Sequence, residues 1–119
     1  MEYRRLGNSG LKVSEIGLGG NNFGGRSDTK QSIEVINHAL ELGINFIDTA
    51  ELYSQGRSEE LVGQAVKGKR SQVIIATKFG YRRTLTPAQQ GGSRDYIMKA
   101  VEASLKRLNT DYIDLYYIH

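Results

Sequence analysis

The chain alternates between short apolar runs and longer segments in which apolar residues recur every three or four positions, and this alternation restricts the possible folds most strongly. The short runs are typical of strands, and the periodic segments are typical of amphipathic helices. After a hairpin at 3–13, the sequence predicts strands at 14–20, 44–48, 73–79 and 112–119, with helices over 32–42, 59–67 and 94–108. Strands that alternate with helices form parallel sheets through right-handed crossovers. We therefore predict an α/β protein with four parallel strands and three helices.

Polar residues and glycines mark the ends of these segments. Capping side chains are expected at Asp28 or Thr29 for the first helix, at Ser58 for the second and at Ser93 for the third. In the hairpin, Gly10 can supply the positive φ that a short turn requires.

Two architectures are compatible with this order of elements, an open doubly wound sheet and part of a (β/α)8 barrel. Nucleotide binding by the open sheet usually shows G-x-G-x-x-G directly before the first helix. Here Gly17, Gly19 and Gly20 lack that spacing, and a long loop separates them from the helix. Since the chain also lacks a G-x-x-x-x-G-K-[ST] loop, we favour the barrel.

Composition narrows the class of protein. The 119 residues suggest one domain, and the absence of cysteine excludes disulfides and thiolate chemistry and fits the cytoplasm. No run approaches the ~18 apolar residues of a membrane span. The net charge of +3 comes largely from basic runs at 67–70 and 81–83, which have the character of solvated loops. We therefore expect neither a membrane nor a nucleic acid as partner.

Three chemically active side chains stand at the ends of predicted strands. Asp48, Lys78 and His119 each close an apolar run, and Tyr53 lies in the loop after one of them. Catalytic residues of parallel barrels gather at the carboxyl ends of the strands. We therefore predict that these four side chains converge on one mouth of the barrel.

Each residue also has an ordinary structural explanation. Asp48 could bond a loop N–H group, Lys78 could extend from the strand end into water, and His119 could be a solvated end. Tyr53 is one of seven tyrosines and means little alone. The joint pattern favours chemistry instead.

The four side chains suit the reduction of a carbonyl group. Such a reaction needs a hydride on carbon and a proton on oxygen. Tyr53 could supply the proton, because an ammonium group such as that of Lys78 favours an ionised phenol nearby. Asp48 could hold Lys78 in place, and a neutral His119 could donate a hydrogen bond to the carbonyl oxygen. Because no protein side chain supplies hydride, a nicotinamide cofactor is expected.

The residues that carry these patterns resemble a known family. The stretches FIDTAELYSQGRSEELVGQAV, VIIATKFG and DYIDLYYIH are similar to the aldo-keto reductases, and the start, YRRLGNSGLKVSEIGLGGNNFGG, is similar to the branch related to potassium-channel beta subunits. The resemblance implies NAD(P)H-dependent reduction of small aldehydes or ketones, with NADP as the default cofactor and no metal. It places the catalytic tetrad on Asp48, Tyr53, Lys78 and His119.

The same resemblance implies where the cofactor binds. It assigns cofactor contacts to Gly20, Asn21, Asn22 and Asp48, although family members often carry threonine where Asn21 stands. The hairpin corresponds to the plug that closes the barrel floor. Substrate choice is not indicated by these residues.

Residues 1–119 correspond to the N-terminal half of such a barrel, because a complete one has ~250 residues. We expect a lone half to expose Val73, Ile75, Ile113 or their alternating neighbours, and to leave two strand edges unpaired. We therefore predict self-association or a missing C-terminal half. The alternative function is a non-catalytic half-barrel or regulatory module that acts by association.

Overall fold

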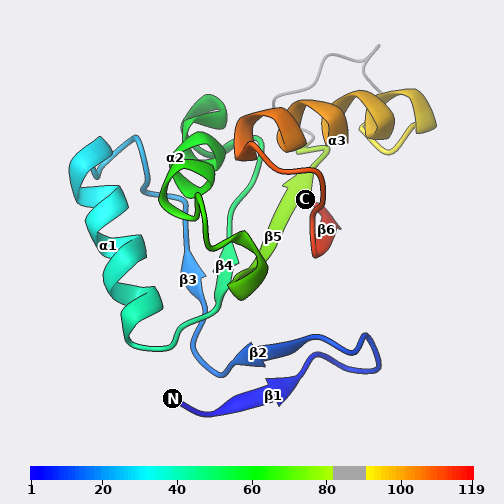
Figure 1. Cartoon of the computed structure of the whole chain (residues 1–119). Coiled ribbons are helices and arrows are strands. Elements are labelled where there is room, and N and C mark those ends of the chain that lie inside the picture. Colours follow the sequence, from blue (N-terminus) through cyan, green and yellow to red (C-terminus); the bar gives the residue numbers. More distant parts are fainter. Residues whose placement is uncertain (82–90) are drawn as a thin grey trace.

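The computed structural model describes residues 1–81 and 91–119, which form a parallel sheet, a layer of helices and an antiparallel hairpin (Figure 1). The elements are β1 (Tyr3–Arg5), β2 (Lys12–Ser14), β3 (Leu18–Gly19), α1 (Thr29–Glu41), β4 (Phe46–Asp48), η1 (Tyr53–Gly56), α2 (Arg57–Ala65), η2 (Arg70–Gln72), β5 (Ile74–Phe79), α3 (Arg94–Leu108) and β6 (Leu115–Ile118). The order in the sheet is β3-β4-β5-β6, and every neighbouring pair is parallel. The predicted four parallel strands and three helices are confirmed; the arginines of the basic run at 81–83 lie outside the described residues.

The hairpin β1–β2 lies beyond the end of the sheet at which the strands begin (Figure 1). Its contact with the sheet is made by Ser14 and Asn45, the residue just before β4. The Ser14 backbone N–H donates to Asn45 Oδ1 at 2.7 Å, and the Asn45 N–H donates to Ser14 Oγ at 3.1 Å. This reciprocal pair fixes the hairpin at the amino end of the sheet.

The register of the strands determines which polar residues lie side by side at their carboxyl ends. Asp48 on β4 stands opposite Ala76 on β5. Because side chains alternate between the two faces of a strand, Lys78 shares a face with Ala76 and lies two residues further along β5. Lys78 in turn stands opposite Tyr117 on β6, so that His119 follows on the same side.

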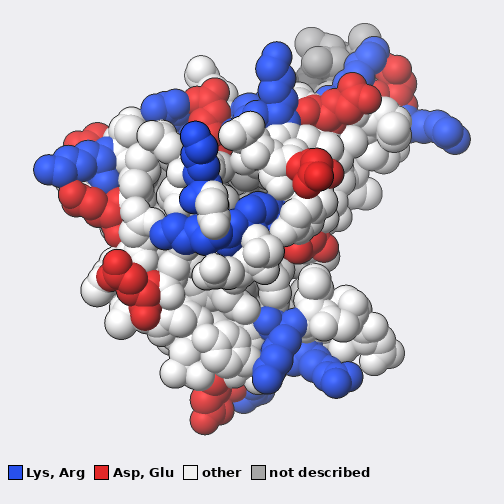
Figure 2. Space-filling model, viewed as in Figure 1, with Lys and Arg blue, Asp and Glu red and all other residues white. Residues whose placement is uncertain are grey.

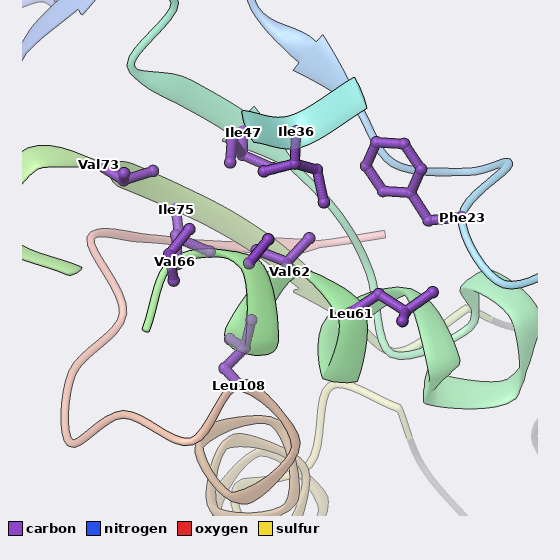
Figure 3. Close-up of a cluster of buried hydrophobic side chains, with 10 residues drawn as sticks. Phe23, Ile36, Ile47, Leu61, Val62, Val66, Val73, Ile75 and Leu108 are labelled. Atoms are coloured by element: carbon purple, nitrogen blue, oxygen red, sulfur yellow. The ribbon is translucent and has the colours of Figure 1, made fainter. Parts of the chain in front are cut away.

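A core of buried apolar side chains fills the space between the sheet and the helices (Figure 3). Strand residues Ile47 and Ile75 meet Ile36 of α1 and Val62 of α2 there, and all four are 0% exposed. Further members of the core are Phe23, Leu61, Ala65, Val66, Val73 and Leu108. The helical periodicity read from the sequence thus corresponds to burial against one face of the sheet.

The sequence left open whether Val73 and Ile75 or their alternating neighbours are exposed, and the structure excludes the first alternative. The side chains of Val73 and Ile75 are 3% and 0% exposed because they point toward the helices, and Ile113 is partly buried against the same core. The alternating neighbour Ile74 is on the other face and is half-buried. Ile74 is therefore more exposed than Val73 and Ile75, because the side-chain period of two turns it away from the helices.

Two of the three predicted helix caps are confirmed. Asp28 accepts a hydrogen bond from the Gln31 N–H while the Gln31 side chain accepts one from the Asp28 N–H, which is a capping box. Ser93 caps α3 by accepting from the Tyr96 N–H. Ser58 does not cap α2, which begins one residue earlier after Gly56, because its hydroxyl is bound elsewhere.

Helices α2 and α3 approach each other closely at Gly63. A Cβ atom on this glycine would lie within 2.6 Å of the carbonyl carbon of Leu108. The absence of a side chain therefore lets α2 contact the backbone at the end of α3.

Arg70 joins the beginnings of β5 and β6. Its guanidinium donates to Thr110 Oγ1 at 3.1 Å, to Val73 O at 2.7 Å, to Tyr112 O at 2.9 Å and to Asp114 Oδ2 at 2.7 Å. Asp114 Oδ2 also accepts from the Ile75 N–H at 2.9 Å. One side chain therefore fixes both strands at the end of the sheet that is remote from Lys78.

On the face shown in Figure 2, acidic side chains lie beside the basic ones both over the helices and near the hairpin. Within residues 1–81 and 91–119, no helix is both long enough and apolar enough to cross a membrane.

Candidate active site

Asp48 and Lys78 form an ion pair at the carboxyl ends of β4 and β5. Lys78 Nζ donates to Asp48 Oδ2 at 2.8 Å and to the backbone oxygen of Thr49 at 2.8 Å. The Lys78 side chain is 14% exposed, whereas that of Asp48 is 35% exposed. The ammonium is therefore enclosed by the chain segment that follows Asp48.

Tyr53 is brought to this ion pair by the loop after β4. The loop continues to bond β5, since the Thr49 N–H donates to Ala76 O at 2.9 Å and the Glu51 N–H donates to Lys78 O at 3.1 Å. The third donor bond of Lys78 Nζ goes to the Tyr53 hydroxyl at 3.1 Å. An acid, an amine and a phenol thus meet, as predicted.

The backbone after Tyr53 has an unusual left-handed conformation. Ser54, Gln55 and Gly56 have φ values of 49°, 55° and 89°. Side-chain-bearing residues adopt such values only where the surroundings enforce them. The turn at 54–56 redirects the chain from Tyr53 into α2.

His119 completes the group from β6. Its backbone N–H donates to Phe79 O at 2.8 Å, which extends the pairing of β6 with β5. Its imidazole meets the Tyr53 ring edge-on at 5.8 Å between centroids and lies 5.0 Å from the Tyr81 ring. The four predicted tetrad residues are therefore gathered at one end of the sheet.

The surroundings of His119 favour its neutral form. Partial burial lowers the pKa of His119 below its ordinary value of 6.5, and the charge of Lys78 acts in the same direction. Asp48 and Glu51 oppose this shift less strongly. A neutral imidazole keeps one N–H donor and one acceptor nitrogen.

Gly20, Asn21 and Asn22 form the loop that leaves β3 beside Asp48. The Gly20 N–H donates to Asp48 O at 2.8 Å, and Gly20 O accepts from Ser58 Oγ at 2.8 Å. A Cβ atom on Gly20 would lie 2.9 Å from Ser58 Oγ, so that only glycine fits without displacement. Asn21 and Asn22 are exposed in this loop.

The sequence interpretation missed several residues that hold the site. Thr49 and Ser58 are both 0% exposed and share a hydroxyl–hydroxyl bond of 2.8 Å under the Gly20 loop. Glu51 accepts from the Gly80 N–H at 3.0 Å and from the Tyr96 hydroxyl at 2.8 Å, and so joins the Tyr53 loop to α3. Nothing in the local pattern marks Glu51.

Glu59 is a missed residue that the sequence does signal. It lies in the first turn of α2, where acidic residues are common, yet it is 0% exposed. Glu59 precedes Val62 and Val66 by three and seven positions, and this spacing places it on the buried face of α2.

No group of three or more His, Cys, Asp or Glu residues in the described part of the chain could hold a metal ion. The chemistry available is that of a phenol, an ammonium group, a carboxylate and an imidazole in contact. Such a set can move a proton to or from an oxygen atom placed beside it.

The chain is similar in sequence and in structure to known proteins. The model of the Aldo/keto reductase family matches residues 15–119. The aldo-keto reductase YhdN of Bacillus subtilis is 48% identical to the chain and matches all of it, over 38% of its own length. A probable voltage-gated potassium channel subunit beta of Arabidopsis thaliana is 41% identical, again over the whole chain and 37% of its own length.

A solved structure, the holo form of the aldo-keto reductase AKR11C1 from Bacillus halodurans, superposes with a TM-score of 0.88 at 46% identity, covering 100% of this chain and 40% of that one. The chain thus spans about two fifths of the length of these relatives and corresponds to the N-terminal part of their barrel. From the match over residues 15–119 and the structural likeness, the chain belongs to the aldo/keto reductase family.

Proposed function

We propose that the chain carries the catalytic residues of a nicotinamide-dependent reductase that converts aldehydes or ketones to alcohols, with Tyr53 as the general acid. One observation carries this proposal: Lys78 Nζ lies 2.8 Å from Asp48 Oδ2 and 3.1 Å from the Tyr53 hydroxyl. A loop tyrosine with no catalytic role would not need an enclosed ammonium group beside its oxygen.

Each residue has a part in the transfer of a proton. Tyr53 gives its proton to the carbonyl oxygen, and the Lys78 ammonium stabilises the phenolate that remains. Asp48 holds the ammonium and balances its charge. His119, which is neutral because its pKa is lowered, donates a hydrogen bond to the same carbonyl oxygen and orients the substrate.

The residues present fit a nicotinamide cofactor. No described side chain can deliver a hydride to carbon, and the bound cofactor would supply it. Asn21 and Asn22 offer exposed amides beside Asp48, and Gly20 keeps the loop close to that strand end. The holo form of the Bacillus halodurans relative supports a bound cofactor in this family. We propose NADP, which the family resemblance implies as the default, and a small carbonyl compound as substrate.

Completion of the barrel is also a proposal. Ile118 is 73% exposed at the end of β6, and β3 and β6 are the outer strands of the described sheet. Further strands, from a C-terminal half or from a second copy, would cover these edges. Sedimentation velocity over a range of concentrations tests association of the 119-residue chain, and a folded monomer at all concentrations would contradict it.

The function is tested by turnover. The assay follows NADPH oxidation with 4-nitrobenzaldehyde or methylglyoxal, for the chain alone and for a fusion in which the remaining part of YhdN follows His119. Tyr53→Phe should lower the rate by about 100-fold or more, because it removes the proton donor. Tyr112→Phe, at the opposite end of the sheet, is the matched control and should be unaffected.

Two results would count against the enzyme. If Tyr53→Phe and Tyr112→Phe turn over NADPH equally, Tyr53 is not the acid. If neither protein binds NADPH while the chain forms a stable assembly, the non-catalytic module that acts by association is the better explanation.

A further inference from the structure

We propose that the buried ion pair between Glu59 and Arg107 is a positioning device, which holds Tyr53 and Lys78 at their working distance. The inference rests on the proposed function, since it assigns Tyr53 and Lys78 the chemical step. Among the described residues, the side-chain hydrogen bonds of Glu59 and Arg107 go to each other, to Thr77 and to Ser104, and not to Tyr53 or Lys78, so that both act through other residues.

Glu59 is a fully buried carboxylate with both oxygens engaged. Its Oε1 accepts from Thr77 Oγ1 at 2.6 Å, and its Oε2 accepts from Arg107 Nε at 2.5 Å. Glu59 and Thr77 are 0% exposed, and the Arg107 side chain is 26% exposed. Buried ion pairs add little net stability, because desolvation offsets their attraction. Stability alone therefore does not account for a carboxylate at this position.

The first branch of the device reaches the strand that carries Lys78. Thr77 directly precedes Lys78 on β5, and the two side chains point to opposite faces of the sheet. The bond from Thr77 to Glu59 therefore fixes the rotation of the strand at the residue next to Lys78. A strand free to roll at Thr77 would carry the Lys78 ammonium away from its partners.

The second branch reaches the turn that carries Tyr53. Arg107 extends from the last turn of α3 and covers Gly56, where a Cβ atom would lie 2.7 Å from Arg107 Cδ and 3.0 Å from Arg107 Nε. Gly56 ends the left-handed turn at 54–56, and Ser54 and Gln55 hold that conformation although both carry side chains. Such a turn persists only where neighbouring groups enforce it. Arg107 contacts this turn at Gly56.

The two branches meet in one pair of charges. Glu59 connects to β5 through Thr77, and Arg107 connects to the turn at 54–56 through Gly56. Strand β5 carries Lys78, and the turn at 54–56 directly follows Tyr53. The relative position of strand and turn therefore sets the 3.1 Å distance between Lys78 Nζ and the Tyr53 hydroxyl. Helices α2 and α3, which carry the pair, lie side by side (Figure 1).

The test observes this distance without cofactor or substrate. In the full chain labelled with ¹³C in lysine and tyrosine, the nuclear Overhauser cross-peak between the Lys78 ε-methylene and the Tyr53 ring reports their proximity. Tyr53→Phe identifies the signal. Amide hydrogen exchange at 54–56 reports the turn, and circular dichroism reports the fold.

Three variants separate positioning from folding. Arg107→Lys keeps a positive charge beside Glu59, and Glu59→Gln keeps the shape but removes the charge. Both should weaken the cross-peak and speed exchange at 54–56 while the helical signal persists. Glu60→Gln is the matched control, because Glu60 is the neighbouring residue, is half-exposed and pairs with Arg57 on the surface. It should behave as the unsubstituted chain.

An unchanged cross-peak and unchanged exchange in folded Arg107→Lys would overturn the inference, and this variant decides the matter if Glu59→Gln does not fold. In the turnover assay, Arg107→Lys should lower kcat by about tenfold with KM unchanged, since misplacement affects the reacting geometry and not ground-state binding. Absence of NADPH turnover in every protein would reject the proposed function, yet the cross-peak would still accept or reject the positioning device.

Discussion

Lys78 and Tyr53 are 25 positions apart in the chain, yet the ammonium nitrogen of one lies 3.1 Å from the hydroxyl of the other. The parallel register between β4 and β5 brings this about, because the loop after Asp48 continues to bond β5 as far as Lys78. The contact depends on backbone pairing before it depends on either side chain.

Asp48→Asn should disturb this contact while leaving the shape of the residue intact. Lys78 would keep its bonds to Thr49 and Tyr53 but lose its counter-charge. We expect a loss of about 1–2 kcal/mol in the free energy of unfolding, less than for a fully buried pair because Asp48 is 35% exposed. Turnover of the fusion protein should fall by about ten- to a hundred-fold. Urea unfolding and the NADPH assay measure the two effects.

The matched control for Asp48→Asn is Asp95→Asn. Asp95 pairs with Lys99 on α3, and both side chains are well exposed. This substitution should change neither quantity noticeably. Equal effects of the two substitutions would show that Asp48 has no special part in the site.

His119 should titrate below its ordinary value. Partial burial and the charge of Lys78 lower the pKa of His119 beneath 6.5, so that the folded chain binds this proton less tightly than the unfolded chain. The unfolded state therefore holds more protons as the solution becomes acidic, and this contribution to stability is lost as the pH falls below about 6.5. Lys78→Gln removes one cause of the shift and should raise the pKa of His119. The pKa of His119 is measured from the imidazole NMR signals, which His119→Gln identifies. An identical titration midpoint in Lys78→Gln would show that the charge of Lys78 does not lower this pKa.

Tyr96 should ionise at a higher pH than an ordinary tyrosine. Burial, followed by the hydrogen bond to Glu51, raises the pKa of Tyr96 to about 12 from 10.0. The folded chain retains this proton where the unfolded chain has lost it, so stability should decline as the pH rises from about 10 to about 12. Glu51→Gln should move the midpoint down without restoring 10.0, because burial is the larger cause. Ultraviolet titration measures the midpoint, with Tyr96→Phe to identify the component.

Ser58→Ala should loosen the Gly20 loop. The buried hydroxyl donates to Gly20 O and meets Thr49 Oγ1, so its removal takes away the side-chain partner of Thr49 and leaves Gly20 O with only the Phe23 N–H. We expect a loss of about 1–3 kcal/mol in the free energy of unfolding. Ser71→Ala, at an exposed position, is the control. A stability equal to that of Ser71→Ala would mean that the Ser58 hydroxyl is not needed.

Gly63→Ala should separate α2 from α3. The added methyl group would strike the Leu108 carbonyl, which is backbone and cannot rotate aside. Overpacking of this kind costs about 1–3 kcal/mol, measured by urea unfolding. Gly92→Ala provides the control, since a Cβ atom there would meet nothing within 4 Å. If both variants unfold at the same urea concentration, the helices have adjusted without cost.

Periodicity and strand ends were enough to predict the element order, the barrel type and the meeting of Asp48, Tyr53, Lys78 and His119. These features depend on local pattern and on a general property of parallel sheets. The sequence did not decide which face of β5 meets the helices, because an apolar run such as 73–76 has no polar alternation to orient it. Ser58 has the pattern of a cap because serine often is one; its actual partners, Gly20 and Thr49, lie 38 and 9 positions away.

The support behind the site was not predicted for the same reason. Glu59 pairs with Arg107 across 48 positions and Glu51 with Tyr96 across 45. No local spacing encodes such pairs. The buried face of α2 did indicate that Glu59 is enclosed, but only the fold shows which cation lies beside it.

The hydrogen bonds of Arg70 have a consequence for how variants are interpreted. They hold β6 against β5 at the amino ends of the two strands. A shift of β6 by one residue would turn its side chains to the wrong faces and move His119 away from Tyr53 and Lys78. The position of the His119 imidazole thus depends on hydrogen bonds at the end of the sheet opposite the candidate active site. Substitutions at Thr110 or Asp114 would look like catalytic defects in an assay, although their true fault would be a misaligned strand.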